Sequence, residues 1–157
     1  MWKLPLDDPR WSELRHRQGS AADVPARLRQ LLDHPEDRAA FSELWPYLCS
    51  EGTTHSAPFA AVPYIVEVCE KLPAGTRFEH LVFLGLVSMH AGPHSEGEDE
   101  VALAYADTRP RILAMLGEEI AFEHDAANTR YLLAAIAALK GYPKMATSIE
   151  WLDDSLP

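Results

Sequence analysis

The sequence predicts an all-α fold in which about six to eight helices stack as an α–α superhelix, or solenoid. A proline followed by apolar residues three and six positions later occurs three times, beginning at Pro25, Pro63 and Pro110. Apolar residues around these prolines recur at helical spacing, whereas no segment alternates apolar and polar residues as a half-buried strand does. We therefore expect a single helical-repeat domain over residues 1–157 and no β-sheet.

Residues 48–72 show the expected repeat unit most completely, with a polar loop, a proline entry and then an amphipathic helix. One face of that helix bears Ala60, Tyr64 and Glu67 and is expected to point away from the core. The opposite stripe is apolar and must be buried against neighbouring helices. Its members are Val62, Ile65, Val66, Cys69 and Leu72.

Capping residues and helix breakers place the helices of the N-terminal half. Asp8 and Pro9 suit the start of a short helix, and Asp23 caps a second one that a tight turn joins to a third. Pro46 lies inside the third helix, where it removes a backbone donor and should bend or stop the helix near Leu44. These three helices are expected at residues 10–16, 24–32 and 41–48.

The C-terminal half also consists of apolar, helix-forming segments separated by glycine and proline. Thr76 and Glu79 form a capping box before a helix that is apolar on almost every side and should therefore be buried. A late alanine-rich segment is strongly helical and allows a neighbour to approach closely. We expect helices at residues 76–89, 98–105, 110–120 and 126–139, and a short terminal turn at 145–152.

Composition indicates one cytoplasmic domain without a cofactor. At 157 residues and 47% hydrophobic, the chain can bury a substantial core. Cys49 and Cys69 occupy apolar helical positions, which favours reduced, buried thiols over a disulfide or a zinc pair. The first residues do not resemble a signal peptide, and the longest apolar run, 81–87, is too short to cross a bilayer.

The formal net charge of −10 is concentrated in one part of the chain, since residues 96–125 contain nine acids and two bases. A nucleic-acid-binding protein needs the opposite sign, so we expect no nucleic-acid partner. Such a surface attracts a basic protein, although a charged face can equally serve solubility alone. The partner-binding residues expected in this block are Glu96, Glu98, Asp99 and Glu100.

A second candidate surface is the polar loop that contains Glu51, Thr53 and His55. Residues of these types commonly form a helix-capping turn, here with Ser56 as the cap. A loop at the edge of stacked helices can also contact a partner, and its histidine could serve acid–base chemistry near neutral pH. No nucleophile elbow, glycine-rich phosphate loop or H-E-x-x-H motif accompanies it.

An enzymatic alternative is a metal-dependent hydrolase, or another enzyme, built around His55 or around His90 and His94. Two histidines four residues apart share a metal ion only when both are on one helix. Gly92 and Pro93 lie between His90 and His94 and break such a helix. We therefore expect no metal site and no catalytic residues. Aromatic side chains can also anchor a protein partner, and among the tryptophans we expect Trp2 and Trp11 to be the more accessible.

The order of these motifs resembles that of small bacterial HEAT- or armadillo-like helical-repeat proteins over about residues 20–140. Ala22-Asp23-Val24-Pro25 lies 38 positions before Ala60-Ala61-Val62-Pro63, and Glu51-Gly52-Thr53 precedes the second of these segments. Related sequences have His-Gln-Gly-Thr where this chain has Ser50-Glu51-Gly52-Thr53, so no role of that histidine–glutamine pair can be transferred. The resemblance implies a binding scaffold and supplies no catalytic residues.

These observations together predict a non-enzymatic protein-binding protein. One concrete role is an immunity protein whose acidic surface neutralises a cognate basic bacterial toxin. A nucleic-acid-processing role would instead require a continuous basic groove. The arginines available for such a groove are Arg10, Arg15, Arg17, Arg27 and Arg29.

Overall fold

The computed structural model describes residues 1–49, 55–91 and 99–153, and within these ranges the chain is mostly helical. This confirms the predicted all-α class. The described elements are the 3₁₀ helix η1 (Pro9–Ser12), the strands β1 (Arg15–His16) and β2 (Gly19–Ser20), and the helices α1 (Val24–Asp33), α2 (Arg38–Leu48), α3 (Ala57–Lys71), α4 (Phe78–Met89), α5 (Glu100–Ile120), α6 (Ala126–Leu139) and α7 (Pro143–Glu150).

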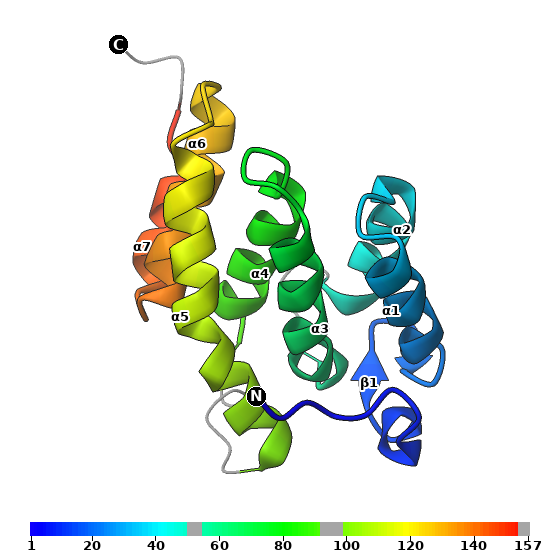
Figure 1. Cartoon of the computed structure of the whole chain (residues 1–157). Coiled ribbons are helices and arrows are strands. Elements are labelled where there is room, and N and C mark those ends of the chain that lie inside the picture. The colour runs from blue at the N-terminus through cyan, green and yellow to red at the C-terminus, as the bar shows by residue number, and fades with distance from the viewer. Residues whose placement is uncertain (50–54, 92–98, 154–157) are drawn as a thin grey trace.

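The helices pack as pairs that follow one another in chain order. Helix α3 packs between α1 and α5, α4 packs against α6, and α7 packs against α6 and also contacts α4. The turns of the α1–α2, α3–α4 and α5–α6 pairs all lie at the same edge of the molecule, at the top of Figure 1. We call this the turn edge. Across the described ranges, every helix falls short of what a bilayer-crossing segment needs in length or apolar character.

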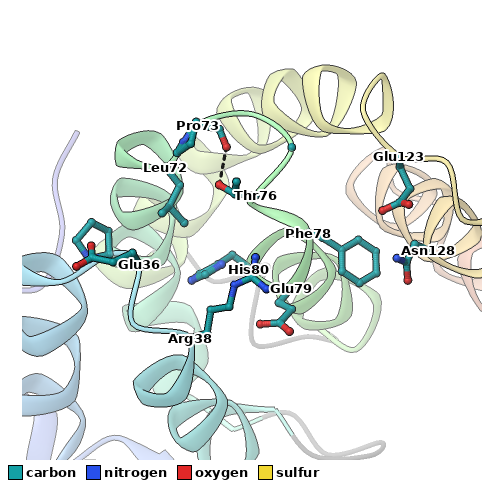
Figure 2. A pocket seen from close by; sticks show the side chains of 12 residues that line it. Glu36, Arg38, Leu72, Pro73, Thr76, Phe78, Glu79, His80, Glu123 and Asn128 are labelled. Carbon is teal, nitrogen blue, oxygen red and sulfur yellow. Dashed lines mark hydrogen bonds between the residues drawn. The ribbon is translucent and has the colours of Figure 1, made fainter.

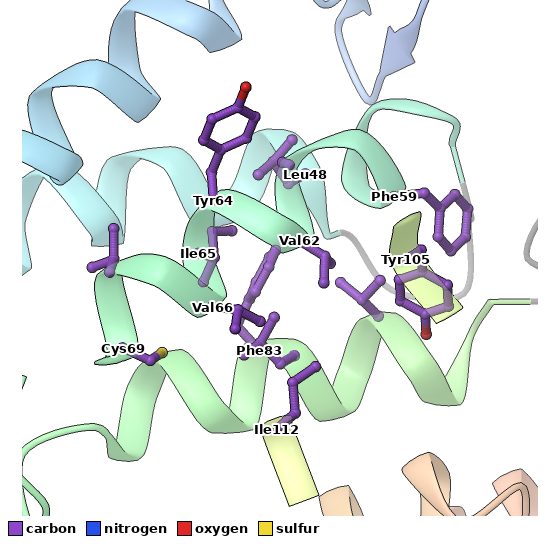
Figure 3. Packing of buried hydrophobic residues seen from close by; sticks show 14 of the residues in the cluster. Leu48, Phe59, Val62, Tyr64, Ile65, Val66, Cys69, Phe83, Tyr105 and Ile112 are labelled. Atoms are coloured by element: carbon purple, nitrogen blue, oxygen red, sulfur yellow. The ribbon is translucent and has the colours of Figure 1, made fainter. Parts of the chain in front are cut away.

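Helix α3 forms the centre of the hydrophobic core, with Phe83 of α4 and Ile112 of α5 among the side chains packed around it (Figure 3). The prediction that Ala60 and Tyr64 face away from the core is wrong, because both are buried. Residues 1–12 cover this face: Leu4 is buried, and its backbone oxygen accepts a hydrogen bond from the Tyr64 hydroxyl.

The predicted helix at residues 10–16 is also wrong beyond its first turn. Asp8 caps η1 as expected, accepting a hydrogen bond of 2.8 Å from the Arg10 amide. The chain then forms the small antiparallel sheet β1–β2, in which Arg15 pairs with Ser20, so the prediction of no β-sheet is also wrong. Gly19 turns the chain with a φ of 134°, which a residue with a side chain rarely adopts. Strands of two residues are too short to produce an alternating sequence pattern.

Two prolines lie inside helices that continue through them: Pro46, where the sequence predicts a bend or a stop, and Pro110, where it predicts the start of a new helix. Helix α2 continues through Pro46 to Leu48, and one helix, α5, covers the two segments predicted at 98–105 and 110–120. Pro46 and Pro110 are both exposed, so a carbonyl left without its backbone donor can bond to water instead. The buried stripe of α5 also continues past Pro110, from Thr108 to Ile112.

Two further predictions concern side chains rather than elements. Trp11 is buried rather than accessible, and its indole N–H donates to the backbone oxygen of Pro5 at 2.9 Å.

The two cysteines, Cys49 and Cys69, are free thiols. Burial raises the pKa of both, to about 11 for Cys49, so both thiols stay protonated and unreactive at neutral pH.

Candidate functional site

A pocket of about 440 Å³ opens at the turn edge (Figure 2). The α1–α2 turn and the start of α2 form one wall, and the α3–α4 turn with the first residues of α4 forms another. Glu123 and Asn128, at the α5–α6 turn and the start of α6, complete the lining. The pocket therefore exists only because three successive helical pairs meet here, and we call it the turn-edge pocket.

His80, in the first turn of α4, is the most unusual residue of this lining. Its side chain is only 3% exposed, and neither ring nitrogen has a hydrogen-bond partner. The imidazole stacks on Phe41 of α2, with ring centroids 3.9 Å apart and an interplanar angle of 24°. Burial, with a smaller contribution from the Arg38 guanidinium, lowers the pKa of His80 to about 4. The ring is therefore neutral at physiological pH and offers one donor and one acceptor.

Charged side chains surround this neutral ring. Glu36, Glu79 and Glu123 line the pocket with carboxylates from three different parts of the chain, whereas Arg38 is its single cation. Within the described residues Arg38 and Glu79 form no ion pair, and Glu36 reaches only His34, at 4.0 Å. The lining therefore has an excess of negative charge that is not neutralised internally.

A buried carboxylate fixes the wall formed by the α3–α4 turn. Glu119 of α5 is 3% exposed and accepts hydrogen bonds from the Gly75 amide at 2.7 Å and the Arg77 amide at 2.9 Å. The predicted capping box is thus wrong: α4 begins at Phe78, and the Thr76 hydroxyl donates back to Pro73. Glu119, from a helix distant in sequence, instead satisfies two amides of the turn that leads into α4.

The turn is further held by Arg77, whose side chain is largely buried. Its Nε donates to the backbone oxygen of Leu72 at 2.8 Å, and its Nη1 pairs with Glu118 at 2.8 Å. The two neighbouring glutamates of α5 therefore have different roles. Glu119 is buried beneath the turn, while Glu118 pairs with Arg77 at the surface.

The polar side chains of this lining are poorly placed for acid–base chemistry. A histidine with a pKa near 4 is a weak base at neutral pH. The one lining hydroxyl, that of Thr76, is committed to the Pro73 carbonyl at 2.7 Å and does not contact His80. The pocket can instead accept a ligand that offers hydrogen-bond donors and positive charge.

We expect the stability of the protein to fall between pH 7 and pH 5 because of His80. The folded pKa is below the unfolded value of about 6.5, so the unfolded chain takes up a proton first as the pH falls. The contribution of His80 is complete above pH 6.5 and decreases down to about pH 4. Urea unfolding should show a loss of about 1–2 kcal/mol at pH 5 that is absent in His80→Phe. An imidazole signal of His80 that titrates near pH 6.5 would contradict this.

A second groove, at the edge opposite the turn edge, contains two of the acids predicted to bind a partner. Asp99 and Glu100 line this groove of about 470 Å³ together with Ser56, the neighbour of His55. Asp99 caps α5 by accepting from the Ala102 amide at 2.9 Å, and Glu100 pairs with Arg10 at 3.2 Å. Each acid thus also has a structural role, while His55 is half-buried.

The remaining predicted residues of these surfaces lie outside the described residues; they are Glu51, Thr53, Glu96, Glu98 and His94. Two expected helix caps are described and are wrong. Ser56 does not cap α3, because its hydroxyl accepts from the Arg15 amide at 3.0 Å. Asp23 makes no capping hydrogen bond to α1 and instead contacts Nε2 of His16 at 3.1 Å.

No other described histidine forms an evident reaction centre. His16 has both ring nitrogens engaged, since Nδ1 accepts from the Gln18 amide at 3.0 Å and Nε2 faces Asp23. His90 lies at the C-terminal end of α4. Among the residues that the structure describes, no three histidine, cysteine or acidic side chains are grouped closely enough to hold a metal ion.

Two of the five arginines predicted as members of a basic groove are paired with acids in the structure. Arg10 pairs with Asp8 and Glu100, and Arg27 pairs with Asp23.

Comparisons of the chain with models of known protein families, with curated proteins and with solved structures found no match. The function of the chain is therefore inferred from the physical chemistry of the turn-edge pocket and of the second groove.

Proposed function

We propose that this chain is a non-enzymatic protein-binding helical-repeat protein that binds a basic partner protein through its acidic surface. The observation on which this rests is the turn-edge pocket, where three carboxylates from three successive helical pairs meet around a neutral histidine. The net charge of −10 has the same sign as the pocket and favours the approach of a basic partner over long distances.

The side-by-side packing of α1, α3 and α5 supports the proposed HEAT- or armadillo-like superhelix. In such a scaffold each helical pair adds a turn to the same edge, so a partner can contact several turns at once. The groove lined by Asp99 and Glu100 offers a second, weaker acidic surface, because Arg10 also lines it and pairs with Glu100. Neither groove requires a bound cofactor.

The concrete role we propose is that of an immunity protein that neutralises a cognate bacterial toxin. A toxin that acts on nucleic acid has a positively charged substrate groove, and acidic side chains can occupy it in place of phosphates. Binding of this type is fast and weakens as salt is added, because charge complementarity mainly raises the association rate.

The direct experiment is to co-express the protein with the product of the neighbouring gene, purify the complex and test whether growth is rescued. We expect a complex whose association rate falls steeply between low and physiological salt. Rescue should be weakened by Glu79→Gln combined with Glu123→Gln and unaffected by Glu43→Gln, which changes an exposed acid of α2 outside the pocket. A neighbour that neither binds nor harms the cell would count against the immunity role.

A further inference from the structure

The deep part of the turn-edge pocket contains hydrogen-bonding capacity that the folded chain does not use. Both nitrogens of His80 are buried without partners, although an unsatisfied buried polar group costs about 1–3 kcal/mol. The stacking on Phe41 fixes the orientation of the ring, so His80 cannot easily turn toward water. Both nitrogens are closed off from solvent, so a ligand in the pocket can satisfy one of them only when a neighbouring side chain such as Arg38 moves aside.

The charges of the lining indicate the sign of that ligand. Figure 2 shows Glu79 and Arg38 beside His80, with Glu36 and Glu123 on opposite sides of the pocket. Three carboxylates and one guanidinium leave the lining with a net charge of −2 while His80 is neutral. An anion would gain one favourable neighbour and meet three repulsive ones, so the electrostatic balance favours a cation.

The shape and the walls further favour a cation on an apolar stem. Leu72, Pro73 and Phe78 give the pocket an apolar wall against which methylene groups can pack. A guanidinium group has five N–H donors and no acceptor, which matches a lining of carboxylates and one free imidazole nitrogen. Its planar, delocalised charge also loses less hydration on burial than an ammonium group does.

We propose that the turn-edge pocket receives an arginine side chain of the partner protein, with His80 accepting a hydrogen bond at the deep end and Glu79 pairing with the guanidinium. This inference rests on the proposed function, because it assigns to the basic partner the residue that enters this pocket. Arg38 is then an opposing charge that must move aside for the ligand. Removing that charge should strengthen binding, whereas it would abolish binding of an anion.

The test uses the full chain and L-argininamide as the probe, with L-citrullinamide as the control, which has nearly the same shape and lacks the charge of the guanidinium group. The ring signals of His80, assigned through their contacts with Phe41, are followed by NMR during each titration. We expect argininamide to shift them saturably, with an affinity on the order of millimolar, and citrullinamide to bind more than about 5-fold more weakly. No saturable shift, or equal binding of the two probes, would overturn the inference.

Variants at the exposed positions Glu79 and Arg38 distinguish a cation site from an anion site without disturbing the core. Glu79→Gln should weaken argininamide binding by about 2- to 5-fold and Arg38→Gln should strengthen it by a similar factor, with Glu43→Gln unchanged. Inorganic phosphate serves as the anionic probe. If phosphate shifts the His80 signals and Arg38→Gln abolishes that response, the pocket is an anion site and the inference is wrong.

The outcome is independent of the test of the immunity role. If argininamide binds but no protein partner is found, the assignment of the pocket is retained and the proposed function is rejected. A partner that binds equally well to the wild type, Glu79→Gln and Arg38→Gln would leave the proposed function standing and place the contact elsewhere, for example in the groove lined by Asp99 and Glu100.

Discussion

Replacing Glu119 with glutamine should lower the free energy of unfolding by about 2–4 kcal/mol. The carboxylate accepts hydrogen bonds through both of its oxygens, from the Gly75 amide and the Arg77 amide. Glutamine has almost the same shape, but it presents one oxygen and one NH₂ group to two donors. One amide is then left facing another donor, in a site where Glu119 is only 3% exposed.

The neighbouring residue is a matched control for this prediction. Glu118→Gln removes one charge from the same helix and the same turn, but the Glu118 side chain is 60% exposed and pairs with Arg77 at the surface. We expect a loss below about 1 kcal/mol, as for other exposed ion pairs. Urea unfolding of both variants measures the difference, and equal losses would show that Glu119 does not hold the turn.

Glu119 also illustrates what the sequence could and could not predict. The acid had been grouped with its neighbours as part of a charged surface block. Its spacing, however, continues the buried positions Leu116 and Ile112 of the same helix, which lie three and seven residues earlier. Helical periodicity could therefore have identified it as a buried acid. Its partners, Gly75 and Arg77, could not have been named, because they lie more than forty residues away in the chain.

The helices themselves were largely predictable because their apolar spacing is local information. Helix α6 has the expected bounds, and α4 begins two residues later than expected. Errors arose where tertiary contacts decide the local structure. Asp23 and Ser56 stand where caps belong, yet each bonds to the β1–β2 region instead, at His16 and at Arg15.

The turn-edge pocket was missed for the same reason. His80 lies inside a segment that is apolar on almost every side, and a single histidine in such a segment is itself a signal of a buried polar group. The sequence does not show, however, that Phe41 stacks on it or that Arg38 lies beside it, since both belong to another helical pair. The acidic block at residues 96–125 was predicted from composition, which gives the charge of a segment but not its position relative to the other turns.

The close packing of α4 against α6 gives the second large effect, a loss of stability in Gly85→Ala. A Cβ atom at Gly85 would lie 2.3 Å from the Cβ and 2.7 Å from the Cα of Ala135, so the two helices would have to move apart. Overpacking of this kind costs up to about 3 kcal/mol, and the better helix propensity of alanine returns about 1 kcal/mol. We therefore expect a net loss of about 2 kcal/mol.

Gly117→Ala is the control, because it makes the same substitution in the interior of another helix. A Cβ atom at Gly117 of α5 meets nothing within 4 Å, so only the gain in helix propensity remains. This variant should be more stable than the wild type by about 0.5–1 kcal/mol. Thermal and urea unfolding should thus give changes of opposite sign for one chemical change. If both variants were stabilised, the contact between α4 and α6 would be looser than described.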